Sequence, residues 1–243
     1  MTQTNIPATF DEISDAMRDY LADIYRIGRG QLWVSTTVIA EQLSVSGPAT
    51  VRMVRRLQER GLVEHLPYKG VRLTPDGTTA ALLAIRRHRL AERFLVDVLH
   101  FGWHEIHEQA ETLQKGITAA IEDRMDALMG YPATCPHGDP IPSKSGTMPP
   151  LNDRPLTVVP QGITGTISRV KTREAEKLQY LAEIGMVPGA RFTLENRGRF
   201  NGPLRILLND RDEHIIGSEL AAAIWVNCDD PLPARVPEES KNG

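Results

Sequence analysis

Ser46-Gly47-Pro48-Ala49-Thr50-Val51-Arg52-Met53-Val54-Arg55-Arg56-Leu57 is the most informative stretch of this 243-residue sequence. Pro48 stands in the first turn, where a helix tolerates proline, and Gly61 marks the end of the helix that this stretch predicts. Ser35 is a good N-cap for a helix before it, and Ser44-Val45-Ser46-Gly47 is the short turn between the two. The order of helix, turn and helix predicts a DNA-reading helix-turn-helix.

The segments on both sides complete a winged helix-turn-helix. Upstream, apolar residues repeat at three and four positions between Phe10 and Gly28, which predicts an amphipathic helix. Downstream, residues 62–66 and 71–74 predict two strands, joined by the tight turn Pro67-Tyr68-Lys69-Gly70. We therefore predict a DNA-binding domain over residues 1–74.

The second helix of such a domain places its first residues in the major groove, where serine, threonine and arginine can bond base edges. Basic and aromatic residues of the wing are suited to phosphate contacts, which fix the register on DNA. The predicted DNA contacts are Ser35, Thr36, Ser46, Pro48, Ala49, Thr50, Arg52, Met53, Arg55, Arg56, Tyr68, Lys69 and Arg72. Winged helices also serve as protein-interaction modules, which is the alternative to DNA binding.

Basic residues are concentrated around this element. Residues 46–93 contain ten Lys and Arg residues against four acidic ones, whereas the whole chain has a formal net charge of -3. A basic block in an otherwise acidic chain is the pattern expected for phosphate contact. The alternative is a solvated helix face.

The composition is that of an ordinary globular protein, with 41% hydrophobic and 24% charged residues. No apolar run approaches the ~18 residues that a membrane-spanning helix needs, and the N-terminal residues do not resemble a secretory signal. Two cysteines, Cys135 and Cys228, do not make a disulfide framework, which fits a reducing compartment. We therefore expect a cytoplasmic protein without a membrane partner or an organic cofactor.

The middle of the chain predicts three further helices. A long one runs from Pro75 to about His100, another from His104 to about Thr118, and a shorter one covers residues 121–129. The helices have apolar residues on more than one face, which favours a helical homodimer interface. The alternative is a core formed by one chain.

Two of these helices each carry a His–Glu pair with a spacing of four. His88 and Glu92 lie on one predicted helix, and His107 and Glu111 lie on the next, so each pair shares a face. Helical bundles build divalent-metal sites from such pairs, although a single pair is more often a surface contact. A zinc-protease motif is excluded, because Glu108 stands where the second histidine of that motif belongs. Together with the DNA-reading helix, these pairs indicate a metal-sensing transcription regulator.

The last third of the chain changes character. Residues 131–160 contain eight prolines, which predicts a linker that is mobile past Pro142. Glycines then separate short β-rich runs up to about Val226, which predicts a small β-barrel. The final residues are polar and rich in proline, so we expect a disordered tail.

Four motifs give the chain a resemblance to the diphtheria-toxin-repressor family of metal-dependent repressors, in its manganese-responsive branch. They are Ser46-Gly47-Pro48, Arg87-His88-Arg89-Leu90-Ala91-Glu92-Arg93-Phe94-Leu95, His107-Glu108-Gln109-Ala110-Glu111 and Cys135-Pro136-His137-Gly138-Asp139-Pro140-Ile141-Pro142. The β-rich segment is similar to the family's SH3-like domain, also found in ferrous-iron-transport accessory proteins, with residues 183–189 as the matching stretch. The expected fold is therefore mainly α with β. Its domains are a winged helix-turn-helix (1–74), a helical dimerisation and metal-binding domain (75–142), a linker (143–155), an SH3-like small β-barrel (156–228) and a disordered tail (229–243).

The resemblance implies two metal sites per subunit. The ancillary site takes His88, Glu92 and His107, with Glu174 at the position of a ligand from the SH3-like domain. The primary site joins Asp19 of the first helix to Glu111, a pair that manganese-responsive members use. Carboxylate oxygens without a thiolate suit Mn²⁺, and Fe²⁺ is the alternative.

The sequence departs from the family in the primary site, where Gln114 and Lys115 stand in place of Glu and His. Glutamine can ligate weakly through its carbonyl oxygen, whereas a protonated lysine repels a metal ion or pairs with a carboxylate. Cys135 and His137 are ligands in some relatives and are candidates to complete a site with Glu92 or Glu111; otherwise only the ancillary site binds tightly. Cys135 packing in a Pro-rich loop is the alternative, and Cys228 is not expected to ligate.

The function implied is that of a homodimeric, Mn²⁺-responsive repressor of metal-uptake genes that binds a palindromic operator. Three alternatives stay open. One is an Fe²⁺-responsive or constitutive regulator, and another is a metal-buffering protein. The third, a metallo-hydrolase, would need an open coordination position and a general base, for which the sequence gives no support. We therefore do not expect an enzyme.

Overall fold

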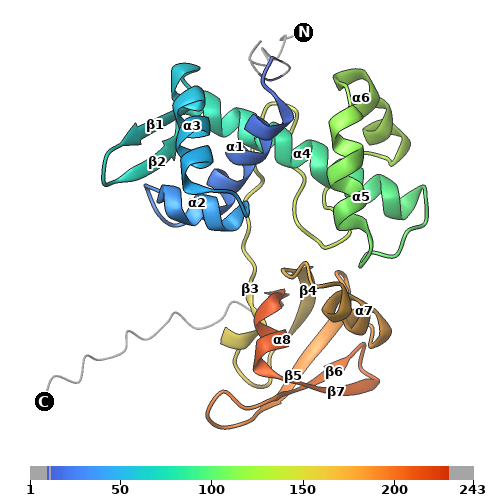
Figure 1. Ribbon diagram of the computed structural model, residues 1–243. Coiled ribbons are helices and arrows are strands. Elements are labelled where there is room, and N and C mark those ends of the chain that lie inside the picture. Colours follow the sequence, from blue (N-terminus) through green and yellow to red (C-terminus); the bar gives the residue numbers. More distant parts are fainter. Residues whose placement is uncertain (1–9, 11, 230–243) are drawn as a thin grey trace, which may run out of the picture. The chain divides into compact units, whose positions relative to one another are not determined.

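The computed structural model describes residue 10 and residues 12–229, which form two compact units. The first unit contains residues up to 136 together with 140–150, and the second contains 137–139 together with the residues from 151 onward. Within the described part of the chain, no helix has the length and hydrophobicity needed to cross a bilayer. The helices and strands of both units are labelled in Figure 1.

The first unit begins with the predicted winged helix-turn-helix. Serine side chains at the N-caps of its three helices each accept a hydrogen bond from the first turn, which explains where the helices start. Backbone hydrogen bonds between Val34 and Val71 attach the hairpin to the segment before the second helix. The elements are α1 (Asp15–Ile27), α2 (Thr36–Gln42), α3 (Gly47–Glu59), β1 (Val63–Leu66) and β2 (Gly70–Leu73).

Helix α4 (Pro75–Asp97) is the axis of the first unit (Figure 1). Its first half packs against α1, and its second half packs against α5 (Ile106–Leu113) and α6 (Ala119–Leu128). Both contacts bury apolar residues inside one chain. Leu83 and Leu90 are among these residues, so packing within one chain explains their burial, and they do not bear on the predicted homodimer interface.

Residues 140–150 belong to the first unit and contact its helices, in contrast to the mobile linker predicted past Pro142. The Pro142 carbonyl accepts a hydrogen bond of 2.8 Å from Arg86, and Lys144 forms an ion pair with Asp123. Met148 packs against the apolar cluster between α1 and α4. Proline-rich composition predicted irregular backbone here, but it does not exclude irregular backbone that is fixed by tertiary contacts.

The second unit is a six-stranded antiparallel sheet with the strand order β3-β8-β4-β5-β6-β7. This confirms the SH3-like β domain, but the prediction of strands alone missed two helices. The strands are β3 (Arg154–Pro155), β4 (Thr164–Val170), β5 (Arg191–Arg197), β6 (Leu204–Leu208), β7 (Asp212–Ile216) and β8 (Ile224–Cys228), and the helices are α7 (Ala175–Glu183) and α8 (Ser218–Ala223).

A buried arginine stabilises this unit. Arg169 is 2% exposed, donates to Asp153 at 2.7 Å and to Asp139 at 3.1 Å, and lies 4.6 Å from the centroid of the Trp225 ring. Burial lowers the pKa of Arg169, but the hydrogen bonds that Arg169 donates to Asp153 and Asp139 outweigh burial and raise the pKa overall.

The predicted disordered tail covers residues 229–243. Asp229 accepts a hydrogen bond from Arg191, and residues 230–243 lie outside the described part of the chain.

Candidate metal centre and nucleic-acid interface

Helix α3 presents most of the predicted DNA contacts to solvent. Ser46, Pro48, Arg52, Arg55 and Arg56 are exposed in the DNA-free chain, whereas Ala49 and Met53 are half-buried. The Ser46 hydroxyl accepts a hydrogen bond from the Ala49 amide and so fixes the start of the helix. The exposed face of α3 is therefore basic and free of competing carboxylate contacts among the described ion pairs.

Thr50 does not belong to this exposed face. Its side chain is fully buried, its hydroxyl lies 3.5 Å from the Tyr20 hydroxyl, and it bonds to the Ser46 carbonyl. The prediction that Thr50 contacts DNA is therefore wrong. Thr50 instead contacts Tyr20 of α1 in the interior of the domain.

The remaining predicted contacts lie before α2 and on the wing. Ser35 caps α2, and Thr36 is its half-buried first residue. Tyr68 and Lys69 are exposed at the turn between β1 and β2. Arg72 is held by Glu64 at 2.7 Å, and its guanidinium carbon lies 4.9 Å from the centroid of the Trp33 ring.

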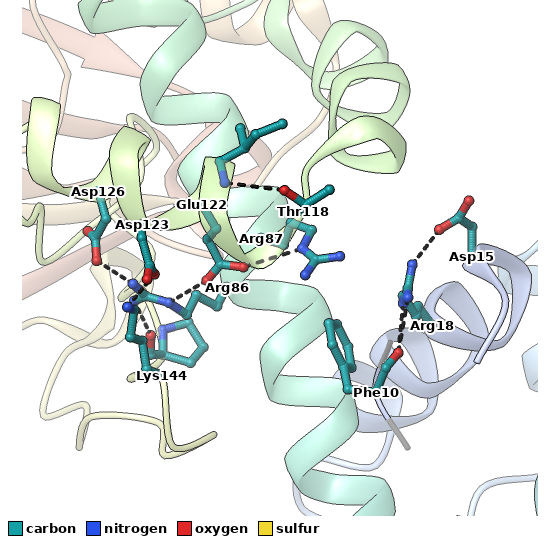
Figure 2. A network of polar contacts seen from close by, with 12 residues as sticks. Phe10, Asp15, Arg18, Arg86, Arg87, Thr118, Glu122, Asp123, Asp126 and Lys144 are labelled. Atoms are coloured by element: carbon teal, nitrogen blue, oxygen red, sulfur yellow. Dashed lines mark hydrogen bonds and ion pairs between the residues drawn. The ribbon is translucent and has the colours of Figure 1, made fainter. Parts of the chain in front are cut away.

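Two arginines of the basic block, residues 46–93, are not exposed for contact with DNA. Arg86 and Arg87 are buried in α4, where Glu122 bonds to both of them and Asp126 bonds to Arg86 (Figure 2). A count of charges along the sequence cannot identify such pairs, because the carboxylates are about 35 residues away on α6. Arg86 and Arg87 therefore link helices instead of binding phosphates.

The two His–Glu pairs meet where α4 and α5 pack together. Donor atoms of His88, Glu92 and His107 all lie within 4.8 Å of one another, and the two imidazole rings are 5.6 Å apart in an edge-to-face arrangement. His88 and Glu92 are buried, and His107 is half-buried. The structure thus brings together three of the four residues assigned to the ancillary site.

The spacing of these donor atoms fits a metal ion. Nε2 of His88 lies 3.3 Å from Oε1 of Glu92, and a ring nitrogen of His107 lies within 4.8 Å of the donor atoms of both residues. Two ligands bound at ~2.0–2.1 Å in a tetrahedral arrangement are about 3.3 Å apart. Imidazole nitrogens and carboxylate oxygens are also ligands that divalent transition metals accept.

Gln114 lies closer to the ancillary site than the resemblance implied. Helix α5 ends at Leu113, and a single 3₁₀ turn over residues 114–116 follows. This turn places Oε1 of Gln114 3.1 Å from Nδ1 of His88, which is the ring nitrogen away from Glu92. A hydrogen bond at one imidazole nitrogen orients the other nitrogen toward a metal.

Asp19, the predicted primary-site residue on α1, is half-buried. Burial raises the pKa of Asp19, the Lys115 ammonium lowers it, and the carboxylates of Asp23, Asp15 and Glu111 raise it further. Asp15 and Asp23 are each paired with an arginine three residues later, whereas no ion pair of Asp19 is found among the described residues. Asp19 therefore lies within electrostatic reach of Glu111 and of Lys115, which is exposed.

The predicted ligands outside α1, α4 and α5 are divided between the two units. Cys135 is buried in the first unit, and its sulfur lies within 4.8 Å of a Glu92 carboxylate oxygen. His137 belongs to the second unit, where its carbonyl accepts a hydrogen bond from Val170. Glu174, also in the second unit, accepts a hydrogen bond of 2.8 Å from Lys177.

Three family models match successive parts of the chain. They describe an iron dependent repressor N-terminal DNA binding domain (residues 12–71), an iron dependent repressor metal binding and dimerisation domain (residues 74–143) and a FeoA domain (residues 154–228). Together they account for both units.

Whole proteins with the same organisation are similar to this chain. The iron-dependent repressor IdeR of Mycobacterium tuberculosis is 29% identical over 89% of this chain and 98% of the relative. A solved manganese-dependent transcriptional repressor in complex with manganese is 37% identical, with a TM-score of 0.80 over 87% of this chain and 99% of that one. The structure of the manganese regulator SloR is 30% identical, with a TM-score of 0.68 over 87% and 98% of the two chains.

Proposed function

Because the chain belongs to the diphtheria-toxin-repressor family of metal-dependent transcriptional repressors, we propose that it binds operator DNA as a Mn²⁺-responsive homodimer. The observation that carries the proposal is the cluster of His88, Glu92 and His107, whose donor atoms lie within 4.8 Å in the same unit as the exposed helix α3. A repressor of this kind contacts DNA through one structural element, here α3, and binds the metal through others, here α4 and α5. The similar proteins are repressors, so a metallo-hydrolase is not favoured.

The ancillary site is formed by His88, Glu92 and His107, with Gln114 orienting the His88 ring. A bound Mn²⁺ would supply the positive charge that keeps these ligands and nearby carboxylates together. Glu92 is buried with one carboxylate oxygen 3.3 Å from the His88 ring, so its negative charge lies among nitrogen and oxygen donors where a cation would be favourable. This role for Gln114 replaces direct ligation as the first expectation, since its oxygen already faces His88.

The primary site is formed by Asp19 and Glu111. Asp19 extends from α1 of the DNA-binding domain, and Glu111 extends from α5, so a shared ligand would fix α1 relative to the dimerisation helices. That arrangement sets the spacing of the two recognition helices on a palindromic operator. A complete switch requires the metal to bind the DNA-competent state roughly 10⁴-fold better than the other state.

Cys135 and His137 are the further candidates for ligands. The Cys135 sulfur is already within 4.8 Å of a Glu92 oxygen. His137 follows only two residues later, so the covalent chain keeps its Cα within about 7 Å of that of Cys135. Glu174 is proposed as the ligand from the FeoA domain, where it is exposed and exchangeable because its present partner is the surface residue Lys177.

The dimer is proposed to form on an apolar surface of α4 and α6. Ile121 is 45% exposed and Leu128 is 66% exposed in the single chain. They line a hollow of about 390 Å³ whose full lining is Phe94, Ala120, Ile121, Arg124, Met125 and Leu128. Exposed apolar surface of this kind marks an interaction site.

Selection from a random-sequence DNA pool tests the proposed function. With Mn²⁺ present, the wild type should enrich an inverted repeat, and binding to that sequence should fall when the metal is chelated. Glu92→Gln should lose the metal response, whereas Glu108→Gln should keep it, because Glu108 is exposed on α5. Enrichment of no sequence with Mn²⁺ or Fe²⁺ would contradict the proposal and favour a metal-buffering protein.

Calorimetry tests the two-site model separately. Asp19→Ala should retain one bound Mn²⁺ per subunit, because His88, Glu92 and His107 come from α4 and α5 alone. Loss of all metal binding in this variant would exclude two independent sites. The same titration with Fe²⁺ under reducing conditions compares the two candidate metals.

A further inference from the structure

Phe10 lies between two arginines from different helices (Figure 2). The guanidinium carbons of Arg18 and Arg87 are 4.8 Å and 4.9 Å from the centroid of its ring, and Phe10 is 3% exposed. Arg18 also donates two hydrogen bonds to the Phe10 carbonyl, at 3.3 Å and 3.0 Å. A cation within ~6 Å of an aromatic ring is attracted by the electrons of its face, and more strongly when both are shielded from water.

Each of the two arginines is paired with a different carboxylate. Arg18 pairs with Asp15 at 2.7 Å, and Arg87 donates to Glu122 at 3.3 Å. These anions limit the repulsion between the two cations that share the ring. Glu122 in turn bonds to Arg86, so the contacts run without interruption from the N-terminal side of α1, across α4, to α6 (Figure 2).

This set of contacts is separate from the metal ligands. Arg87 and His88 are adjacent on α4, but Arg87 contacts α6 while His88 contacts Gln114 and the His107 ring. The same α6 exposes Ile121 and Leu128, which we assigned to the dimer interface. One end of the contact chain is therefore in the DNA-binding domain, and the other end is in the helix that would meet the partner copy.

We propose that Phe10 is a positioning residue that couples the DNA-binding domain to α6 through Arg87 and Glu122, without any metal. This inference rests on the proposed function, because its output is DNA affinity. The coupling fixes α1, and thereby α3, relative to the dimer even before metal binds. It gives the metal-free protein a basal preference for the arrangement that fits DNA.

Phe10→Leu and Phe10→Tyr test the coupling. Leucine keeps apolar contact but has no aromatic ring, whereas tyrosine keeps the ring. Phe10→Leu should weaken binding to the selected DNA about tenfold in metal-free protein, and Phe10→Tyr should restore most of it. Mn²⁺ affinity in calorimetry should also fall in Phe10→Leu and return toward the wild-type value in Phe10→Tyr, because the metal binds the DNA-competent state more tightly than the other state.

Hydrogen exchange of the metal-free full chain gives a readout that does not need DNA. Amides of α1 should exchange faster in Phe10→Leu than in the wild type, and at the wild-type rate in Phe10→Tyr. Arg87→Met should cause little further increase in the exchange of α1 amides in the Phe10→Leu background, since both changes remove the contact between the Phe10 ring and Arg87. Arg93→Met is the control, because it removes a cation from the same helix. The only described ion pair of Arg93 is the partly exposed one with Asp97.

The outcomes separate this inference from the proposed function. If the wild type selects no DNA, the proposed function fails, and α1 exchange alone decides the role of Phe10. Equal α1 exchange in Phe10→Leu and the wild type would overturn the inference. Additive effects of Phe10→Leu and Arg87→Met, or no rescue by tyrosine, would also overturn it, because apolar packing would then be sufficient.

Discussion

Asp19 is subject to opposing electrostatic influences in the metal-free chain. Burial raises its pKa, and the nearby Lys115 ammonium acts in the opposite direction. Because the folded-state pKa is raised overall, the favourable contribution of neutral Asp19 is present at low pH and is lost as the pH rises through that pKa. A cation shared with Glu111 would offset this loss, which suits Asp19 to a metal-controlled step.

Lys115→His should change the metal response. The Lys115 ammonium lowers the pKa of Asp19, so we expect it to replace a metal ion in part and to support basal DNA binding. Histidine removes this charge at neutral pH and adds a possible ligand. We expect weaker metal-free DNA binding and a steeper dependence on Mn²⁺, measured by titration of the selected DNA.

If Lys115→His changes neither the metal-free DNA affinity nor the metal response, the Lys115 side chain points into solvent and does not influence the metal site. The regulatory ion would then be held by other groups. Cys135 and His137 would be the first to replace in that case, with Cys228→Ser as the control for loss of a thiol.

Arg52 and Lys69 should differ in what they contribute to DNA binding. Arg52→Ala should lower the discrimination between the operator and random DNA by about 1–3 kcal/mol if Arg52 reads guanine. Lys69→Ala on the wing should weaken both DNAs equally and reduce the salt slope by about one. Uniform weakening of all DNA by Arg52→Ala would instead identify Arg52 as a phosphate contact.

Helix α5 shows what sequence periodicity could and could not predict. The spacing of His107 and Glu111 correctly placed them on one face, because that relation depends only on the helix repeat. The predicted helix over residues 104–118 was too long, since α5 covers Ile106–Leu113 and ends in a 3₁₀ turn. The contact of Gln114 with His88 depends on that turn and on packing against α4, which the local pattern does not contain.

Gly77→Ala should destabilise the start of α4. Alanine normally stabilises a helix relative to glycine by about 1 kcal/mol. Here a Cβ on Gly77 would lie 1.8 Å from the Leu62 carbonyl oxygen, which also accepts a hydrogen bond from the Thr74 amide. The free energy of unfolding should therefore fall, whereas Gly116→Ala should be tolerated because its Cβ would meet no atom within 4 Å.

For the chain as a whole, the winged helix, the helical region and the SH3-like domain were predictable from motifs and hydrophobic patterns. The pairing of buried charged side chains could not be predicted from the sequence. Arg86 and Arg169 look like ordinary surface residues in the sequence, yet both are buried among carboxylates that are distant in the chain. Thr50 was also misplaced, because its burial depends on packing against Tyr20 of α1, which is 30 residues away in the chain.

Arg169→Met should destabilise the second unit strongly. The substitution keeps an unbranched apolar stem but leaves Asp153, whose side chain is 3% exposed, without its cation. Removing one partner of a buried pair costs about 3–5 kcal/mol. Denaturant unfolding should show this loss, whereas Arg191→Met should cost far less because the Arg191–Asp229 pair is exposed.

The stacking of Arg72 on Trp33 gives the protein an optical property. Indole emission depends on charges near the ring, and Arg72 is one of the residues expected to reach a DNA phosphate. If Arg72 leaves Trp33 for the phosphate, the fluorescence of Trp33 should change on DNA binding, and Trp33→Phe should abolish the change. Trp103 and Trp225 remain in the Trp33→Phe variant, so a fluorescence change that disappears in this variant comes from Trp33, and DNA occupancy could be followed without an attached dye.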